Sequence, residues 1–125
     1  TGGETTGGGT TGADVTFAQV WAEVFQPQGC TAGYCHGAQA GGMLLQSMEQ
    51  AMGQMVNAEA TAEDCGQTIR VVPGSPEESV LWWRVRNEAA GEACSSEKMP
   101  QGMTTGLPEA ESQMIYDWIL GGAKP

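Results

Sequence analysis

The feature that most constrains this chain is a cluster of three reactive side chains in the segment GCTAGYCHG, residues 29–37. Cys30, Cys35 and His36 lie there together, and His36 is the only histidine among the 125 residues. Thiols and imidazoles bind metals and cofactors, and thiols also pair as disulfides. Any fold for this chain must therefore place this segment where it can hold a bound group, ligate a metal or form a disulfide.

The length and composition indicate one folded domain with a separate N-terminal segment. A chain of 125 residues can bury one hydrophobic core. Residues 1–14 contain only Thr, Gly, Glu, Ala and Asp, so we expect a flexible Gly/Thr-rich tether there and a folded domain over 15–125. Neither a membrane span nor a signal peptide is visible. A tether of this kind suits a periplasmic or extracellular protein that is lipid-anchored through residues upstream of it.

The charge balance excludes two classes of partner. Fifteen acidic residues stand against five basic ones, which gives a formal net charge of −10. Nucleic acids and anionic membrane surfaces would be repelled by such a chain. The acidity favours a partner with a basic docking patch, or else it only keeps an exported protein soluble.

Apolar periodicity predicts an all-α fold of short helices. The first helix has a buried stripe, can be capped by Asp14 or Thr16 and stops at Pro27 and Gly29. That stripe comprises Phe17, Val20, Trp21, Val24 and Phe25. The only strand candidate is 68–72, which is short. We therefore expect three to five short helices with long loops.

Three later segments also have helical spacing. Residues Met48, Met52 and Met55 repeat at helical intervals and are interpreted as core filling. A second helix runs from the N-cap Ser75 to about Val85, with Val80, Leu81 and either Trp82 or Trp83 buried. The last begins at Pro108 and ends at Gly121-Gly122, with Ala110, Met114, Ile115, Trp118 and Ile119 on one face. Helices this short, joined by long loops, need a disulfide or a buried prosthetic group to pack around.

The cysteine segment has the residue types of a covalent haem site. A c-type haem is held by two thioethers, and the histidine after the second cysteine ligates iron; the usual motif is Cys-x-x-Cys-His. Here Cys30 and Cys35 are separated by two more residues than usual, and the adjacency of Cys35 and His36 is retained. Gly33 gives the longer loop the backbone freedom to bulge outward.

Further segments extend this pattern along the chain. They are, in order, FAQVWAEVF, CTAGYCHG, GAQAGGMLL, GSPEESVLWWRV, KMPQG and LPEAESQMIYDWILGGA. With these segments the chain resembles the single-haem class I cytochrome c domains of bacteria over nearly all of residues 15–123. The resemblance implies a cytochrome c-like fold wrapped around one covalent haem c, and an electron-transfer function.

The resemblance also implies the second axial ligand, Met99, which would approach iron from the face opposite His36. A thioether is a soft, neutral ligand, and a His/Met pair raises the reduction potential. Met103 is the alternative ligand, and Met43 is less favoured because it follows the attachment motif so closely. In the family the first and last helices cross, which implies contacts among Phe17, Trp21, Trp118 and Ile119.

The two remaining cysteines, Cys65 and Cys94, do not belong to the family pattern. A disulfide between them would close the long loop that carries Met99. On the loop-entropy model it would contribute roughly 3–4 kcal/mol. We therefore expect this pair to be bonded.

Two other readings of the site stay open. Without haem, Cys30 and Cys35 can bond to each other and leave a haemless, disulfide-stapled binding or structural module. A zinc site can also form from Cys30, Cys35, His36 and one of Cys65 or Cys94.

The resemblance implies a carrier of single electrons between exported redox partners, and we expect no enzymatic activity. A Met99 ligand would block the open iron position that peroxide reduction needs. The partner is expected to be a redox protein with a basic docking patch.

Overall fold

The computed structural model describes residues 15–30, 45–88, 99 and 105–125. The predicted tether, residues 1–14, lies outside this part of the chain. In order, the described elements are α1 (Phe17–Val20), the π-helical turn η2 (Trp21–Phe25), α2 (Met48–Met55), β1 (Glu59–Asp64), β2 (Gln67–Ile69), the 3₁₀ turn η5 (Pro76–Glu78), α3 (Val80–Val85) and α4 (Glu109–Leu120).

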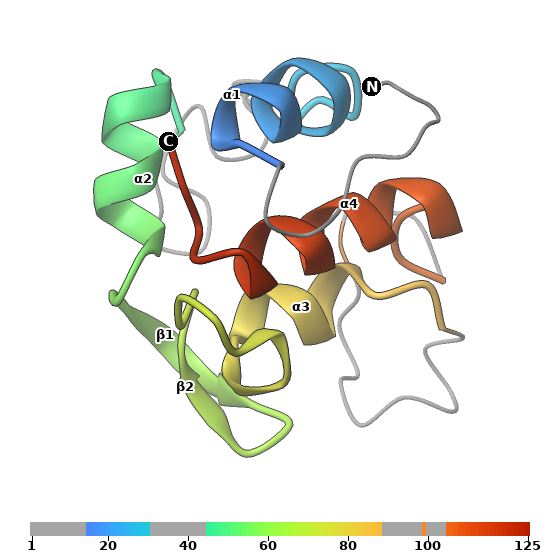
Figure 1. The fold of residues 1–125 in the computed structure, drawn as a ribbon. Coiled ribbons are helices and arrows are strands. Elements are labelled where there is room, and N and C mark those ends of the chain that lie inside the picture. The colour runs from blue at the N-terminus through green and yellow to red at the C-terminus, as the bar shows by residue number, and fades with distance from the viewer. Residues whose placement is uncertain (1–14, 31–44, 89–98, 100–104) are drawn as a thin grey trace.

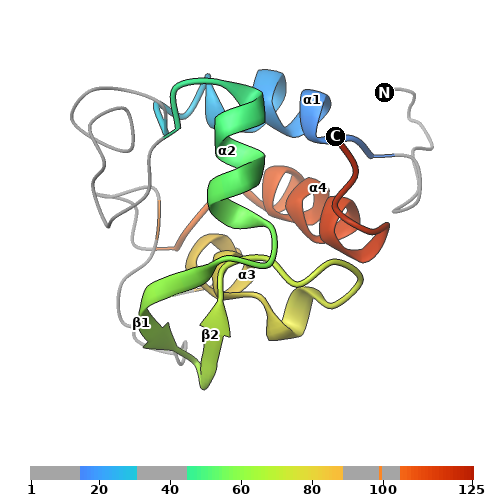
Figure 2. The same ribbon diagram turned by 90° about the vertical axis from the view of Figure 1, so that its left-hand side faces the viewer.

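The described elements stack in layers around one core. Figure 1 shows α1 with η2 above α4, and α3 below α4. In Figure 2, helix α2 stands beside this stack and leads down to the β1–β2 hairpin. Elements from both halves of the sequence therefore contribute to the same core.

Helix α1 begins where the sequence predicts. Thr16 is its N-cap: the Thr16 hydroxyl accepts from the Gln19 amide at 3.4 Å, and the Gln19 side chain accepts from the Thr16 amide at 3.1 Å. This reciprocal pair satisfies two amides that the first helical turn leaves unbonded. The predicted buried stripe is confirmed, since all five of its side chains are at most 9% exposed. The helix widens into a π turn from Trp21 onward, which the apolar spacing did not predict.

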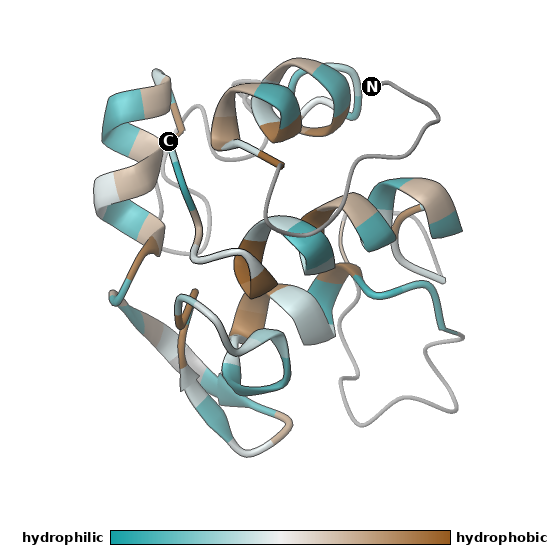
Figure 3. Cartoon of the chain, in the orientation of Figure 1, coloured by the Kyte–Doolittle hydropathy of each residue, from teal (hydrophilic) through white to brown (hydrophobic). Residues whose placement is uncertain are grey.

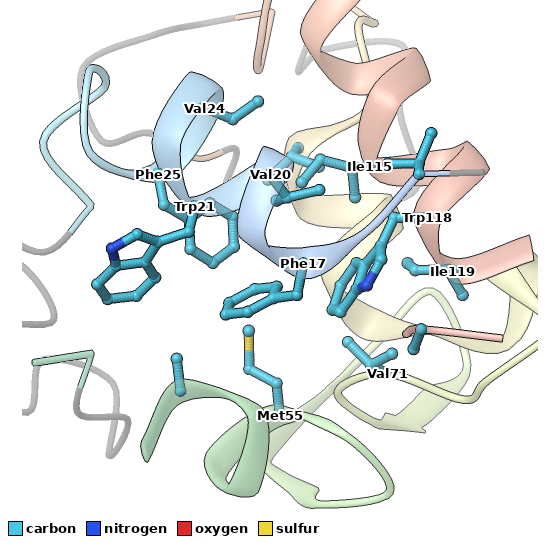
Figure 4. Close-up of a cluster of buried hydrophobic side chains, with 14 of the residues drawn as sticks. Phe17, Val20, Trp21, Val24, Phe25, Met55, Val71, Ile115, Trp118 and Ile119 are labelled. Atoms are coloured by element: carbon cyan, nitrogen blue, oxygen red, sulfur yellow. The ribbon is translucent and has the colours of Figure 1, made fainter. Parts of the chain in front are cut away.

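The core is built on aromatic contacts between α1, η2 and α4. The ring centroids of Phe17 and Trp118 are 5.0 Å apart, and Phe17 also lies 5.9 Å from Trp21 and 5.7 Å from Phe25. Figure 4 shows Phe17 beside Trp118, with the sulfur end of Met55 pointing toward the Phe17 ring. The predicted contact between the first and last helices is therefore confirmed for Phe17 and Trp118.

The predicted all-α fold class is wrong, because the structure contains a β-hairpin. Strands β1 and β2 pair antiparallel, with Glu59 opposite Ile69 and Asp64 opposite Gln67. Cys65 and Gly66 join them with φ angles of 54° and 79°, and a two-residue turn with two positive φ angles has the twist that a hairpin requires. The strand candidate 68–72 overlaps only the end of β2, and Figure 3 shows the hairpin mostly in polar colours.

The helix predicted from Ser75 to Val85 is interrupted at Ser79. Ser79 has extended backbone angles and forms a bridge with Ile69. Its buried hydroxyl donates to the Ser75 carbonyl at 2.9 Å and accepts from the Val72 amide at 2.8 Å. Because the bridge and these two bonds hold Ser79 in an extended conformation, a short 3₁₀ turn precedes it and α3 follows it. Val80 and Trp82 are buried as predicted, whereas Leu81 is half-buried.

Two predicted core positions are exposed. In α2, Met55 is fully buried and Met52 half-buried, but Met48 is 44% exposed. In α4, Ala110 is exposed, although Ile115, Trp118 and Ile119 are fully buried. Both exposed residues lie in the first turn of their helices, which extends beyond the core. No described helix is long and apolar enough to span a membrane.

The segment after α4 turns back to the beginning of α1. Helix α4 ends at Gly121, as predicted, and Gly122 and Ala123 then adopt φ angles of 105° and 54°. The Lys124 carbonyl accepts two hydrogen bonds, from the Phe17 amide at 2.7 Å and from the Trp118 indole at 2.8 Å. Residues near both ends of the described chain are thereby fixed to one another.

Replacing Gly106 by alanine is expected to destabilise the fold. Gly106 has a φ of 76°, and a Cβ there would lie 2.5 Å from the Arg86 carbonyl oxygen and 2.7 Å from that of Val85. The left-handed conformation alone costs a non-glycine residue about 1–2 kcal/mol. Urea unfolding should show at least this loss in the free energy of unfolding.

The matched control is Gly53→Ala in α2, where no atom lies within 4 Å of the added Cβ. Alanine is favoured over glycine inside a helix by about 0.5–1 kcal/mol. This variant should therefore be more stable than the parent chain. Equal effects of both substitutions would contradict the close approach of the backbone at Gly106.

Candidate functional site

Cys30, the first predicted attachment residue, is held by the turns that follow η2. The Gln26 amide donates to the Trp21 carbonyl and the Cys30 amide to the Phe25 carbonyl, both at 2.9 Å. These bonds span five residues and continue the wide spacing of η2. Cys30 is half-buried and packs against the hydrophobic core.

A second contact fixes this end of the segment against α4. The Gln28 side-chain amide donates to the Glu111 carboxylate at 2.7 Å. Gly29 follows with a φ of 78°, a conformation that favours glycine. The backbone that carries Cys30 is therefore attached both to η2 and to the first turn of α4.

The other two residues of the motif, Cys35 and His36, lie outside the described residues. The same is true of the alternative ligands Met43 and Met103 and of Cys94. The attachment and ligation predicted for Cys35 and His36 remain predictions.

Met99, the predicted second ligand, is described and lies against the core. It is half-buried, and its amide donates to the Arg84 carbonyl at 2.8 Å. Arg84 belongs to the last turn of α3, whose carbonyls have no partner within the helix. The end of α3 therefore provides the acceptor that positions Met99.

The chain on either side of the Met99 segment is joined just after α3. The Glu88 amide donates to the Thr105 carbonyl at 3.0 Å, and the Leu107 amide donates to the Val85 carbonyl at 2.9 Å. The Asn87 side chain adds a hydrogen bond to the Leu107 carbonyl at 2.8 Å. Residues 85–88 and 105–107 thus run side by side and fix where the intervening segment leaves and returns.

An ion pair stands next to this arrangement. The Arg84 guanidinium donates to the Asp64 carboxylate, and the side chains are only 18% and 10% exposed. Asp64 ends β1 and precedes Cys65, which is disulfide-bonded. The sequence analysis missed both charged residues, because they are 20 positions apart and form no local pattern.

Aromatic side chains of α3 and α4 take part in a further group of contacts. The rings of Trp82 and Tyr116 are 4.9 Å apart, and the Arg86 guanidinium lies 5.9 Å from the Trp82 ring and 5.2 Å from the Trp83 ring. The Tyr116 hydroxyl donates to the Glu77 carboxylate at 2.9 Å, and this bond raises the pKa of Tyr116 above its ordinary value. These contacts connect α3 to η5 and α4 through a phenol that stays protonated and neutral.

The described residues fit a group bound at the edge of the core. Cys30 and Met99 come from distant parts of the sequence, and each carries sulfur, is half-buried and packs against the same core cluster. A thiol suits a thioether link, and a thioether suits haem iron. The donor types therefore match those that a c-type haem requires.

The zinc hypothesis is narrowed by the state of Cys65. A cysteine in a disulfide cannot supply a thiolate to a metal. The partner of Cys65 has to be one of the other three cysteines of the chain, so neither four-ligand set of the zinc hypothesis stays complete. Among the residues that the structure describes, no three His, Cys, Asp or Glu side chains gather as a metal site.

Comparison with known proteins gives no relative for this chain: no protein-family model, curated protein or solved structure matches it.

Proposed function

We propose that this protein is a single-electron carrier with one covalently bound c-type haem. Cys30 and Cys35 would hold the haem, and His36 and Met99 would ligate its iron. The observation that carries the proposal is that Cys30 and Met99, far apart in sequence, both pack half-buried against one core. When bound, haem supplies a reversible one-electron change at iron.

The chain's own residues would bind the group and limit its access to water. Phe25, five residues before Cys30, and Leu45, nine residues after His36, are 3% and 1% exposed and belong to the core that Cys30 contacts. An apolar environment disfavours the extra positive charge of oxidised haem, and a neutral Met99 thioether would not offset that charge. Both effects support a raised reduction potential. With both axial positions filled by side chains, the site would carry electrons and catalyse no reaction of its own.

The disulfide at Cys65 supports an exported location, because such bonds persist in oxidising compartments. The partner would be a redox protein with a basic patch, since the formal charge of −10 attracts such a surface. Electrostatic attraction of this kind increases association rates without requiring a large interface.

The test is an absorption spectrum of the oxidised and dithionite-reduced protein, made in a host that matures c-type haem, with an intact mass after denaturation. We expect a reduced c-type spectrum and one haem retained on the denatured chain. The control is Cys30→Ala/Cys35→Ala made in the same host, which should retain none. A parent chain that carries no haem, with a mass deficit matching two disulfides, would instead identify a stapled binding or structural module.

A further inference from the structure

The β1–β2 hairpin is connected to Met99 through one residue of α3, Arg84. Its turn brings Asp64 to the Arg84 guanidinium, and the Arg84 carbonyl accepts the Met99 amide at 2.8 Å. One residue of α3 therefore contacts the hairpin through its side chain and the Met99 segment through its backbone.

The Asp64–Arg84 pair is not an ordinary surface ion pair. Exposed pairs contribute little, because water screens their charges, but here the side chains are only 10% and 18% exposed. Removing one member of such a pair deprives a poorly solvated charge of an opposite charge in direct contact with it. Loss of Asp64 is therefore expected to displace Arg84 and with it the last turn of α3.

The Arg84 carbonyl is available to Met99 because α3 stops there. A longer helix would direct the Glu88 amide to this carbonyl, but the Glu88 amide donates to Thr105 instead, at 3.0 Å. The Arg84 carbonyl therefore accepts from the Met99 amide instead. The geometry of the last turn of α3 thus determines where the Met99 backbone lies.

The hairpin is itself firmly attached, so it can act as a support. The Leu81 amide donates to the Arg70 carbonyl at 3.0 Å, and the Arg70 guanidinium donates to the Gln54 carbonyl in α2 at 2.8 Å. The disulfide at Cys65 adds a covalent link at the turn, immediately after Asp64. The Asp64 carboxylate is therefore presented from a backbone that is held at both ends.

We propose that Asp64, acting through Arg84, is a positioning residue that keeps Met99 in its ligating place. This inference rests on the proposed haem function and extends it to residues outside the attachment motif. A neutral thioether is a weak iron ligand, so the fraction of molecules with Met99 bound depends on how well its segment is held. The β1–β2 hairpin would supply that hold.

The test compares Asp64→Asn with Glu63→Gln. Glu63 is the exposed neighbour on β1, so its variant loses the same charge from the same strand. Two readouts are used: hydrogen exchange of the Met99 amide, and binding of added imidazole to the ferric haem in competition with Met99. Because residues in contact are energetically coupled, Asp64→Asn should accelerate exchange of the Met99 amide and tighten imidazole binding, each about tenfold.

The Glu63→Gln variant should stay within about twofold of the parent chain, as expected for a surface change. Covalent haem content should be equal in all variants, because Asp64 is not an attachment residue. If Asp64→Asn does not fold, the double variant Asp64→Asn/Arg84→Gln answers the question, since it removes both charges and leaves neither unpaired.

The outcomes separate the two proposals. Equal exchange rates for the Asp64 and Glu63 variants would overturn the positioning role, whether or not haem is present. Faster Met99 exchange in the Asp64 variant of a chain that carries no haem would retain the positioning role and reject the haem function. Faster exchange with unchanged imidazole binding would show that Met99 is held by the hairpin but is not the ligand, which also overturns the proposal.

Discussion

Replacing Trp118 by alanine is expected to lower the free energy of unfolding by about 3–5 kcal/mol. The Trp118 side chain is fully buried and its ring centroid lies 5.0 Å from that of Phe17. Its indole N–H also donates to the Lys124 carbonyl, so the substitution removes a large apolar volume and a hydrogen bond together. A loss of this size is a large fraction of the whole stability of a domain of this size.

The measurement is urea unfolding followed by circular dichroism, with Leu120→Ala as the matched control. Leu120 lies on the same helix but is 49% exposed, so its removal should change stability by no more than about 0.5 kcal/mol. Similar unfolding midpoints for the two variants would mean that α4 does not bury its Trp118 face against α1.

Replacing Met99 by alanine is expected to lower the reduction potential of the loaded protein by on the order of 100 mV, since axial ligands tune haem potentials over about 0.8 V. A thioether favours ferrous iron, and water or another ligand in its place favours it less. Potentiometric titration of the visible spectrum measures the change. The haem should stay covalently attached, because its thioethers are made by other residues.

The control is Met48→Ala, which removes a methionine that is 44% exposed on α2 and should leave the potential unchanged. Met103→Ala distinguishes the alternative ligand. If the potential falls in the Met103 variant and not in the Met99 variant, the assignment of Met99 is wrong.

The sequence predicted the elements whose apolar residues repeat with the helical period. The stripe from Phe17 to Phe25 and the buried face around Trp118 are strong signals. Large apolar side chains at this spacing lie on one face of a helix, and they are buried together when that face packs against the core. The capping residue Thr16 and the stop at Gly121 are equally local. Such features depend on neighbouring residues alone, and the structure contains them.

The hairpin could not be predicted in the same way. Strand β1 has the sequence EATAED, whose Glu, Ala and Asp residues are depleted in strands. It forms because Ser79 and Arg70 attach the hairpin to the rest of the fold through contacts that are distant in sequence. For the same reason the helix predicted from Ser75 is broken at Ser79, where a local propensity gives way to a tertiary bridge.

The candidate site shows the same division. Cys30 and Met99 were predicted from motifs, and the structure brings both to one core. Met99 is held by Arg84, and Arg84 is held by its ion pair with Asp64 of β1. No local sequence motif indicates either contact. Support of a binding segment is a property of the three-dimensional fold, whereas the donor atoms are a property of the sequence.

The two hydrogen bonds to the Lys124 carbonyl have a consequence for the order in which the protein folds. Because Phe17 donates one of them, the start of α1 can be held in this way only after residue 124 has been made. Contacts between such distant positions slow folding, because a long loop must close before they form. The apolar stripe of α1 therefore stays accessible to chaperones while this region is being synthesised.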